Sequence, residues 1–230
     1  MFLVPLAAAA IAVVFAAMLA REFAAKRRPY TLLWAIAMAC YAVASAMVTL
    51  GVLGGGGWTE REYAIYWALG AVLNVPFLAG GEIVLLFRRP WVRWATWLVL
   101  VFSVAYTTAV LRGAPMDASA LAERLPSGKE VFGAGTAAQH LPQVFSYPAY
   151  FILLAGALWS AWRMRGHPEL RDRFVGTLLI AVGATIVAAG AAFAASGVVV
   201  GFIVTLVVGI AVMFGGFLRA GRRAAVPAAA

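Results

Sequence analysis

The sequence predicts an all-α integral membrane protein, a bundle of seven transmembrane helices with its N-terminus outside and its C-terminus in the cytoplasm. Hydrophobic residues make up 64% of the 230-residue chain, and the mean hydropathy is +0.93. A soluble domain of this length could not bury so much apolar surface. Several stretches also exceed the about 18 nearly uncharged residues that a helix needs to cross the hydrocarbon layer. We therefore expect a single integral membrane domain over residues 1–230.

Each predicted span is an apolar run bounded by charged residues, glycine or proline. The first run is followed by Arg21. It lacks the leading positive charges and the small-residue cleavage motif of a secretion signal, so we interpret it as an uncleaved span. Only Ser196 and Gly197 separate the last two runs, but residues 174–218 are far too long for one crossing. The spans are predicted at residues 2–20, 31–54, 63–87, 91–111, 142–162, 174–195 and 198–218.

The connections between spans are short, with one exception. The segment 54–58 joins the second and third spans, and the outer loop 112–141 joins the fourth and fifth. Within this loop, "DASALAERL" predicts a short helix that is capped by Asp117 and ended by Pro126. A loop of this length is often functional, and the alternative is a surface cap over the bundle.

The basic residues predict the orientation of the bundle. Of the 18 basic residues, 14 lie on one side of the predicted spans, which the positive-inside rule makes the cytoplasmic side. The 14 are Arg21, Lys26, Arg27, Arg28, Arg88, Arg89, Arg93, Arg163, Arg165, Arg171, Arg173, Arg219, Arg222 and Arg223. The other side carries Arg61, Arg112, Arg124 and Lys129.

This one-sided charge also explains the net charge of +9 without a nucleic-acid partner. Arginines at the cytoplasmic face attract anionic lipid headgroups, so we expect the bilayer and those headgroups as partners. Arginine outnumbers lysine 16 to 2, which is typical of a GC-rich bacterial genome. The expected location is therefore a bacterial cell (inner) membrane, crossed several times.

The residue types that catalysis or cofactor binding needs are not placed together. His140 and His167 are expected at opposite faces of the membrane, so they cannot form one metal site or ligate one haem. Ser45, Ser103 and Ser146 have no histidine or lysine at a similar depth. No aspartate lies in a predicted span, the seventh span has no lysine, and no glycine-rich phosphate loop occurs. We expect no enzyme, no cofactor and no metal.

Proline and polar residues interrupt the third span. Pro76 has no N–H, so the carbonyl of Val72 is left without its helical partner. Asn74 lies within one turn of that carbonyl. Glu82 lies about 80° around the helix from Asn74, so both can face the same interior.

The fifth span has a similar interruption. Pro148 frees the carbonyl of Val144, close to Ser146, Tyr147 and Tyr150. Two proline-interrupted helices at corresponding places are typical of a transporter binding site. The predicted ligand- or proton-binding residues are Glu82, Asn74, Pro76, Ser146, Tyr147 and Tyr150.

Glu82 is the least expected of these residues. It precedes Arg88 by six positions, which places it roughly 9 Å inside the membrane boundary at about 1.5 Å per residue. An acid at mid-membrane costs about 2.5–3.5 kcal/mol, and this depth costs less. The carboxyl group is expected to face the bundle interior, where Gly80 and Gly81 let a neighbouring helix approach. There are two interpretations. In the structural one, the carboxyl group is bonded to a hydroxyl or a basic residue or is simply protonated. In the functional one, it is a cation or proton site.

The two halves of the chain share an outline. Spans one to three end in "GGEIVLLFRR", and spans five to seven end in "GGFLRAGRR". The fourth span then connects two parallel three-helix units, as in some transporters. Glycines such as Gly183, Gly201 and Gly209 also crowd the last two spans, which predicts close helix packing there.

The segments "LLWAIAMACYAVASA", "PSGKE" and "GTLLIAVGATIVAAGAAFAASG…VVGIAVMFGGFL" resemble a group of small seven-helix membrane proteins of actinobacteria and related bacteria. That group has no established activity, so the resemblance implies the topology and transfers no functional residue. The "LPQV" of Leu141–Val144 also resembles the proline-glutamine signature of a seven-helix transporter group, although the first span has no matching pair.

These observations favour a protein that binds or transports a small or lipidic ligand through the bundle interior. The alternative is a non-catalytic accessory subunit with a membrane protein partner. A polar cavity that reaches Glu82 would favour transport. A dry interior with a broad outer face of small residues would favour the accessory role.

Overall fold

The computed structural model describes residues 3–53, 57–196 and 198–220. In this part of the chain, seven helical runs are long and apolar enough to cross a membrane, and no strand is present. The runs are α1 (Leu3–Lys26), α2 (Pro29–Leu53), the continuous α3 (Glu60–Tyr66), η1 (Trp67–Leu73) and α4 (Asn74–Leu86), then α5 (Pro90–Arg112), α8 (Ala137–Met164), α9 (Arg171–Ala195) and α10 (Val199–Ala220). The all-α architecture with seven helices long and apolar enough to span a membrane is confirmed, and it is compatible with a multi-pass membrane protein.

Several helices extend beyond the apolar runs that predicted them. α1 continues to Lys26, and α8 begins at Ala137, where Thr136 caps it by accepting a hydrogen bond from the Gln139 N–H. Hydropathy locates the part of a helix that lies in hydrocarbon, whereas the helix itself continues into the polar interface until a cap ends it. The predicted 54–58 turn and the Ser196–Gly197 break lie partly outside the described residues.

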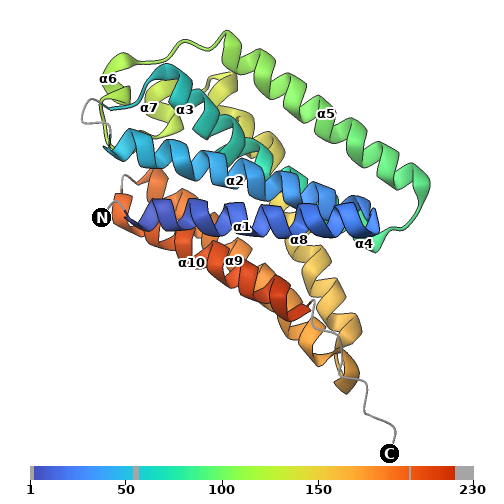
Figure 1. Cartoon of the computed structure of the whole chain (residues 1–230). Helices are drawn as coiled ribbons and strands as arrows, with labels where there is room; N and C mark the ends of the chain where they lie inside the picture. Colours follow the sequence, from blue (N-terminus) through green and yellow to red (C-terminus); the bar gives the residue numbers. More distant parts are fainter. Residues whose placement is uncertain (1–2, 54–56, 197, 221–230) are drawn as a thin grey trace, which may run out of the picture.

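Six of the seven runs form a closed ring. α2 packs between α1 and α4, α4 packs against α8, α8 against α9, α9 against α10, and α10 returns to α1. α5 lies outside the ring against α4, η1 and α8, and Figure 1 shows it at the outer edge of the bundle. Apolar side chains from the ring helices fill its centre, and the Tyr41 hydroxyl of α2 crosses it to donate to the Leu206 carbonyl of α10 at 3.1 Å.

The order of this ring bears on the two-unit outline. If α1–α2–α4 corresponds to α8–α9–α10, the contact of α4 with α8 is equivalent to the contact of α10 with α1, and both contacts are present. α5 then occupies the place of the connecting helix. The internal repeat stays a prediction, and the helix adjacency is compatible with it.

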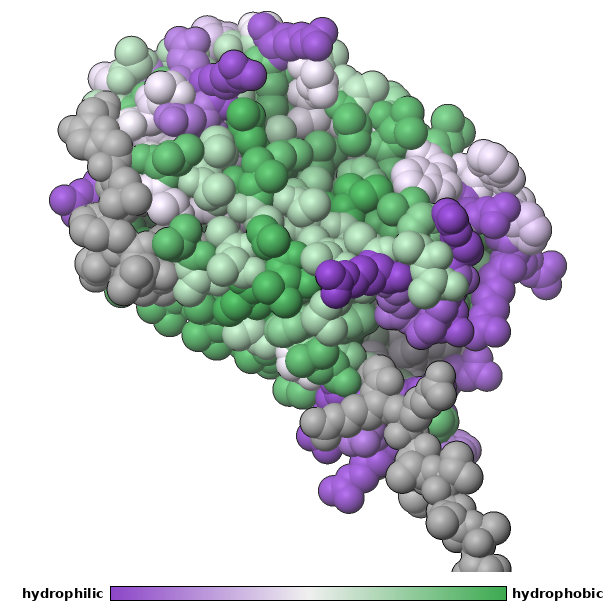
Figure 2. Space-filling view, viewed as in Figure 1, coloured by the Kyte–Doolittle hydropathy of each residue, from purple (hydrophilic) through white to green (hydrophobic). Residues whose placement is uncertain are grey.

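The surface has the distribution of a membrane-spanning bundle. Figure 2 shows a broad band of hydrophobic residues between hydrophilic residues at the two ends of the molecule. Trp91, Trp94, Trp159 and Trp162 are each at least 60% exposed near the arginine-containing connections. Tryptophan is enriched at this depth because its ring is apolar and its N–H is polar.

The last two spans form a tight antiparallel hairpin through glycine. A Cβ built on Gly183 would lie 2.6 Å from the carbonyl oxygen of Gly209, and one built on Gly176 would lie 2.6 Å from that of Gly216. Both distances are below what real Cβ atoms adopt, so these positions require glycine for the two backbones to touch. The predicted close packing of these spans is confirmed.

The outer loop forms a folded cap. α6 (Ala118–Leu121) begins as predicted at Asp117, which accepts a hydrogen bond from the Ser119 N–H at 2.8 Å. Hydrogen bonds from Ser119 and Ala120 lower the pKa of Asp117. The prediction that this helix continues to Pro126 is wrong, because α6 ends at Leu121.

A second cap helix, α7 (Gly128–Phe132), follows. Ser127 and Glu130 form a capping box in which the Ser127 hydroxyl accepts from the Glu130 N–H at 3.3 Å and Glu130 Oε2 accepts from the Ser127 N–H at 2.7 Å. Hydrogen bonding of the Glu130 carboxylate with the side chain and the backbone N–H of Ser127 lowers the pKa of Glu130. The S-x-x-E spacing within "PSGKE" is the signal that could have predicted this helix.

Aromatic side chains hold the cap against the bundle. The Trp58 indole N–H donates to the Arg124 carbonyl at 3.2 Å, and the buried Tyr63 hydroxyl donates to the Pro126 carbonyl at 3.1 Å. Trp58 and Tyr63 belong to one buried cluster with Phe132. The loop therefore forms a folded surface cap over this end of the bundle. This packing does not assign it a function.

Candidate functional site

α4 lies against three helices at the level of Gly80, Gly81 and Glu82. Successive residues of an α-helix point about 100° apart, so three in a row can face three different neighbours. A Cβ on Gly80 would meet side chains of α5, and one on Gly81 would overlap the indole ring of Trp34 on α2. Glu82 faces Gly156 of α8. The two glycines therefore allow close approach of two helices, and the acid is directed toward the third.

The Glu82 side chain is buried, as its predicted orientation toward the bundle interior requires. Only 7% of it is exposed. A Cβ on Gly156 would lie 2.7 Å from Cγ and 3.2 Å from Oε1 of Glu82, so the absence of a side chain at Gly156 makes room for the acid. Within the described part of the chain, its carboxyl group makes no hydrogen bond and no ion pair. Its oxygens keep a little accessible surface, because the one fully buried side-chain polar atom without a partner in these residues is Thr107 Oγ1. Neither predicted structural partner, a hydroxyl or a basic group, is in contact with it there.

The interruption at Pro76 is compensated from α8. The Ser146 hydroxyl lies 2.7 Å from the carbonyl oxygen of Ala71 and 2.8 Å from that of Val72. Pro76 cannot supply the N–H that Val72 would otherwise receive. The sequence-predicted residues Pro76 and Ser146 are thus brought together, and the hydroxyl replaces a missing backbone donor.

Asn74 has a similar role on the same turn. It is 3% exposed, and its Oδ1 accepts a hydrogen bond from the Val75 N–H at 2.6 Å. Its own N–H donates to the Leu69 carbonyl, five residues back, which is the wide turn of the π-helix η1. π-helical turns leave the backbone out of register with the following α-helix, and polar side chains often satisfy the leftover groups. The acceptor atom of Asn74 is therefore engaged by backbone.

A second proline is compensated in a way that the sequence interpretation missed. Pro142 lies inside α8 and cannot donate to the carbonyl of Ala138. The Trp67 indole N–H donates to that carbonyl at 3.0 Å. Each helix thus supplies a donor for a carbonyl that proline leaves free in the other, since Ser146 of α8 bonds to carbonyls of η1 and Trp67 of η1 bonds to a carbonyl of α8. The sequence shows Pro142 and so predicts a free carbonyl at Ala138. The residue that donates to this carbonyl, Trp67, lies far away in sequence and could not be predicted.

The two predicted tyrosines do not join Glu82. The Tyr147 side chain is 55% exposed on the outside of α8. The Tyr150 hydroxyl lies 3.0 Å from Thr185 Oγ1 on α9. Of the six predicted residues, Asn74 and Ser146 make hydrogen bonds to backbone groups near Pro76. The two tyrosines lie on other faces. Glu82 is largely buried and has no hydrogen-bond partner among the described residues. Ligand binding by any of them stays a prediction.

A groove lies one helical turn from Glu82, between the C-terminal ends of α4 and α8. Its volume is about 430 Å³. Leu86 follows Glu82 by one turn, and Ser160 follows Gly156 by one turn, so the groove continues the contact between these helices. The lining residues are Leu86, Phe87, Trp159, Ser160, Arg163 and Met164.

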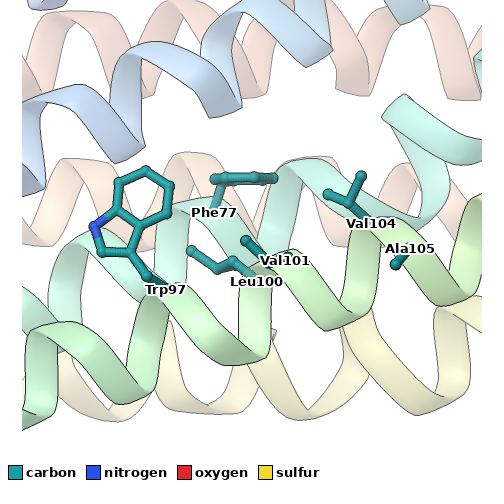
Figure 3. Close-up of a pocket in the computed structure, with 6 residues that line it drawn as sticks. All are labelled: Phe77, Trp97, Leu100, Val101, Val104 and Ala105. Atoms are coloured by element: carbon teal, nitrogen blue, oxygen red, sulfur yellow. The ribbon is translucent and has the colours of Figure 1, made fainter.

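A second hollow, of about 240 Å³, lies between α4 and α5. Figure 3 shows Phe77 of α4 beside Trp97 and Leu100 of α5, with Val101, Val104 and Ala105 further along. Apart from the indole nitrogen, this lining offers only carbon. It suits hydrocarbon chains, and the indole N–H of Trp97 is the one polar side-chain group in its lining.

Metal and cofactor ligands are not clustered in the part of the chain that the structure describes. No group of three or more His, Cys, Asp or Glu side chains there could hold a metal ion. His140 bonds to Gln143 near the start of α8, whereas His167 follows its other end.

No protein-family model, no curated protein and no solved structure matches the chain. The resemblance to small seven-helix membrane proteins therefore stays a prediction.

Proposed function

We propose that this chain is a non-enzymatic membrane protein that binds or transports a small or lipidic ligand through the bundle interior, with Glu82 as the polar anchor. The observation that carries the proposal is a largely buried carboxyl group that has no hydrogen-bond partner among the described residues and keeps a little accessible surface. Buried polar groups are almost always hydrogen-bonded. A ligand that donates a hydrogen bond would satisfy Glu82.

The surroundings of Glu82 support this role more than a purely structural one. Asn74 and Ser146 already satisfy the backbone around Pro76, so Glu82 is not needed for that repair. Gly156 makes room for the Glu82 side chain, and a groove lined by Leu86 and Ser160 lies one helical turn away toward the arginine-containing end. Binding and transport share this anchor.

Replacing the acid tests the proposal. We expect Glu82→Gln to lower the amount of co-purifying ligand about fivefold, because the amide keeps an acceptor oxygen but loses the charge, and a hydrogen bond to a charged group contributes about 1 kcal/mol more than one to a neutral group. The protein would be purified in native lipid, and the bound small molecules and lipids would be quantified per protein by mass spectrometry. Glu60→Gln is the matched control, since Glu60 is exposed at the opposite end of the same helical run.

The elution volume and the thermal stability of Glu82→Gln should match those of the wild type. If the variant folds normally and retains every co-purifying molecule at the wild-type level, Glu82 is a packing residue and the proposal is wrong.

We also propose the orientation, with the N-terminus outside and the C-terminus in the cytoplasm of a bacterial cell membrane. A reporter fused after Ala230 should then be active only in the cytoplasm. One inserted between Ala134 and Gly135, which are exposed in the outer cap, should be active only outside. Activity of both reporters on the same side would contradict the seven-span topology, and exchange of the two sides would reverse the orientation.

One observation favours the second candidate, a non-catalytic accessory subunit. The outward face of α1 carries exposed alanines, which would let a helix of another membrane protein approach closely. The exposed residues of α1 are Ala7, Ala10, Ala17 and Ala20 together with larger side chains such as Leu6, Val13, Val14 and Met18. The same native-lipid preparation distinguishes the two candidates, because an accessory subunit would retain a stoichiometric partner protein and would do so equally in Glu82→Gln.

A further inference from the structure

The groove at the C-terminal ends of α4 and α8 combines a cation, a hydroxyl and apolar walls. Its volume of about 430 Å³ falls within the range of about 300–1,000 Å³ that is typical of ligand sites. Arg163 and Ser160 are three residues apart on α8, so they lie on the same face of the helix. None of the lining residues is acidic, so the buried Glu82 is not part of the groove.

The two polar side chains of the groove have no protein partner in the part of the chain that the structure describes. The Arg163 guanidinium is exposed and makes no ion pair there. The Ser160 hydroxyl makes no hydrogen bond there, whereas the hydroxyls of Ser103 and Thr185 bond to a carbonyl one turn back in their own helices. Both groove side chains can therefore bond to a ligand without breaking a contact within the protein.

The charges around the groove favour an anion. Arg88 and Arg89 directly follow Phe87 and add positive charge at the same end. The carbonyl ends of α4 and α8 carry partial negative charge, so the arginines have to supply the attraction. A guanidinium binds phosphate oxygens through two parallel hydrogen bonds, and a neighbouring hydroxyl can donate a third. An ammonium group would find no carboxylate in the lining. The groove thus fits a phosphate that carries no cationic headgroup.

An apolar surface leads from the groove toward the middle of the membrane. Trp159 is 60% exposed on the wall of the groove, one turn before Arg163. Ala155 and Ile152 precede Trp159 by four and seven residues, so they lie on the same face of α8, and both are exposed. Aromatic rings beside arginines are typical of the level at which lipid phosphates meet hydrocarbon. Acyl chains attached to a phosphate at Arg163 would follow this face into the hydrocarbon.

We infer that the groove binds one anionic phospholipid of the surrounding bilayer, with its phosphate on Arg163 and Ser160 and its acyl chains along the outer face of α8. This inference assigns one lipid to one site, which the general attraction of arginines for anionic headgroups does not. It does not rest on the proposed function, because the lipid lies on the outside of the bundle and Glu82 takes no part in binding it.

Four probes separate the contacts: phosphatidylglycerol, phosphatidylcholine, diacylglycerol and glycerol 3-phosphate. Compared with the first probe, the others add a cationic headgroup, lack the phosphate or lack the acyl chains. Native mass spectrometry of the full chain in a phosphate-free detergent gives an apparent Kd for each probe. We expect one tightly bound phosphatidylglycerol per chain, with about tenfold weaker binding for each of the other three probes.

Arg163→Gln should weaken the binding of phosphatidylglycerol about tenfold and leave that of diacylglycerol unchanged, and Ser160→Ala should weaken it about fivefold. Arg165→Gln is the matched control, because Arg165 is an exposed arginine at the same end that does not line the groove. The titrations are repeated in about 0.5 M ammonium acetate, where the Debye length is only about 4 Å and general surface attraction is screened. The difference between the two arginine variants should persist there.

Equal losses for the two arginine variants would overturn the inference, because the attraction would then belong to the whole surface. Phosphatidylcholine bound as tightly as phosphatidylglycerol would also overturn it, since the groove would not select charge. Equally tight binding of glycerol 3-phosphate would overturn it in favour of a soluble phosphate ester.

Glu82→Gln distinguishes this site from the proposed function. The variant should bind phosphatidylglycerol as the wild type does, and a loss as large as that of Arg163→Gln would contradict a separate site. If Glu82→Gln changes no co-purifying molecule while Arg163→Gln loses phosphatidylglycerol, only the proposed function is wrong.

Discussion

Gly216→Ala should lower the free energy of unfolding by about 1–3 kcal/mol, the usual cost of overpacking, whereas Gly215→Ala should raise it by up to about 1 kcal/mol. A Cβ on Gly216 would lie 2.7 Å from the Gly176 carbonyl oxygen and 3.0 Å from the Ile180 nitrogen, and neither backbone atom can rotate away. A Cβ on Gly215 meets no atom within 4 Å. Alanine there gains helix propensity without a clash. The two variants change adjacent positions of one helix by the same methyl group.

The measurement is denaturant unfolding of both variants in one detergent, followed by tryptophan fluorescence. Gly183→Ala should behave like Gly216→Ala, because its Cβ would lie 2.6 Å from the Gly209 carbonyl oxygen. If Gly215→Ala and Gly216→Ala shift the midpoint in the same direction, the hairpin of α9 and α10 does not depend on backbone contact.

The glycine hairpin shows how far sequence patterns reach in this chain. The density of glycines in the last two spans predicts close packing, but it does not say which glycine meets which carbonyl. That assignment depends on the rotation of each helix, and an almost uniformly apolar helix carries no periodic signal that would fix it. Gly215 and Gly216 are indistinguishable in sequence, and only the structure shows that one is packed and the other is open.

The candidate site divides in the same way. Asn74 and Glu82 could be identified because polar and acidic residues are rare in apolar helices, and Pro76 because it leaves a backbone carbonyl without its N–H. Their partners could not be identified, because the Ser146 hydroxyl lies 74 residues from Val72 and the Trp67 indole 71 residues from Ala138. Hydrogen bonds between separate spans depend on helix order and depth, and a single sequence contains neither. The sequence thus predicts which polar residues belong to the candidate site. It does not predict that Asn74 and Ser146 bond to backbone groups whereas Glu82 has no partner.

Hydrogen bonds to the cap and to α8 hold the α3–η1–α4 run in place on both sides of its proline interruption. α3 is tied to the outer cap by Tyr63, η1 is bonded to α8 through Trp67 and Ser146, and α4 carries Glu82 beside the groove. The hydrogen bonds at Pro76 therefore fix the position of Glu82 relative to α8. Their strength can be measured without any ligand.

Ser146→Ala should lower the free energy of unfolding by about 1–3 kcal/mol, because the carbonyls of Ala71 and Val72 lose their donor where no water can replace it. Ser103→Ala is the matched control and should be nearly neutral. Ser103 is 1% exposed, but its hydroxyl bonds to the Val99 carbonyl of its own helix, which the Ser103 N–H can satisfy.

The dependence on proline is tested by a double-mutant cycle of Ser146→Ala with Pro76→Ala. Alanine at position 76 restores an N–H that can donate to the Val72 carbonyl, so the loss of the Ser146 hydroxyl should cost at least about 0.5 kcal/mol less in the Pro76→Ala background. Both backgrounds are unfolded in the same detergent, and the four free energies give the coupling directly. If the two substitutions add without coupling, the hydroxyl does not replace the missing N–H, and the position of Glu82 depends on packing at Gly156 and Trp34 instead.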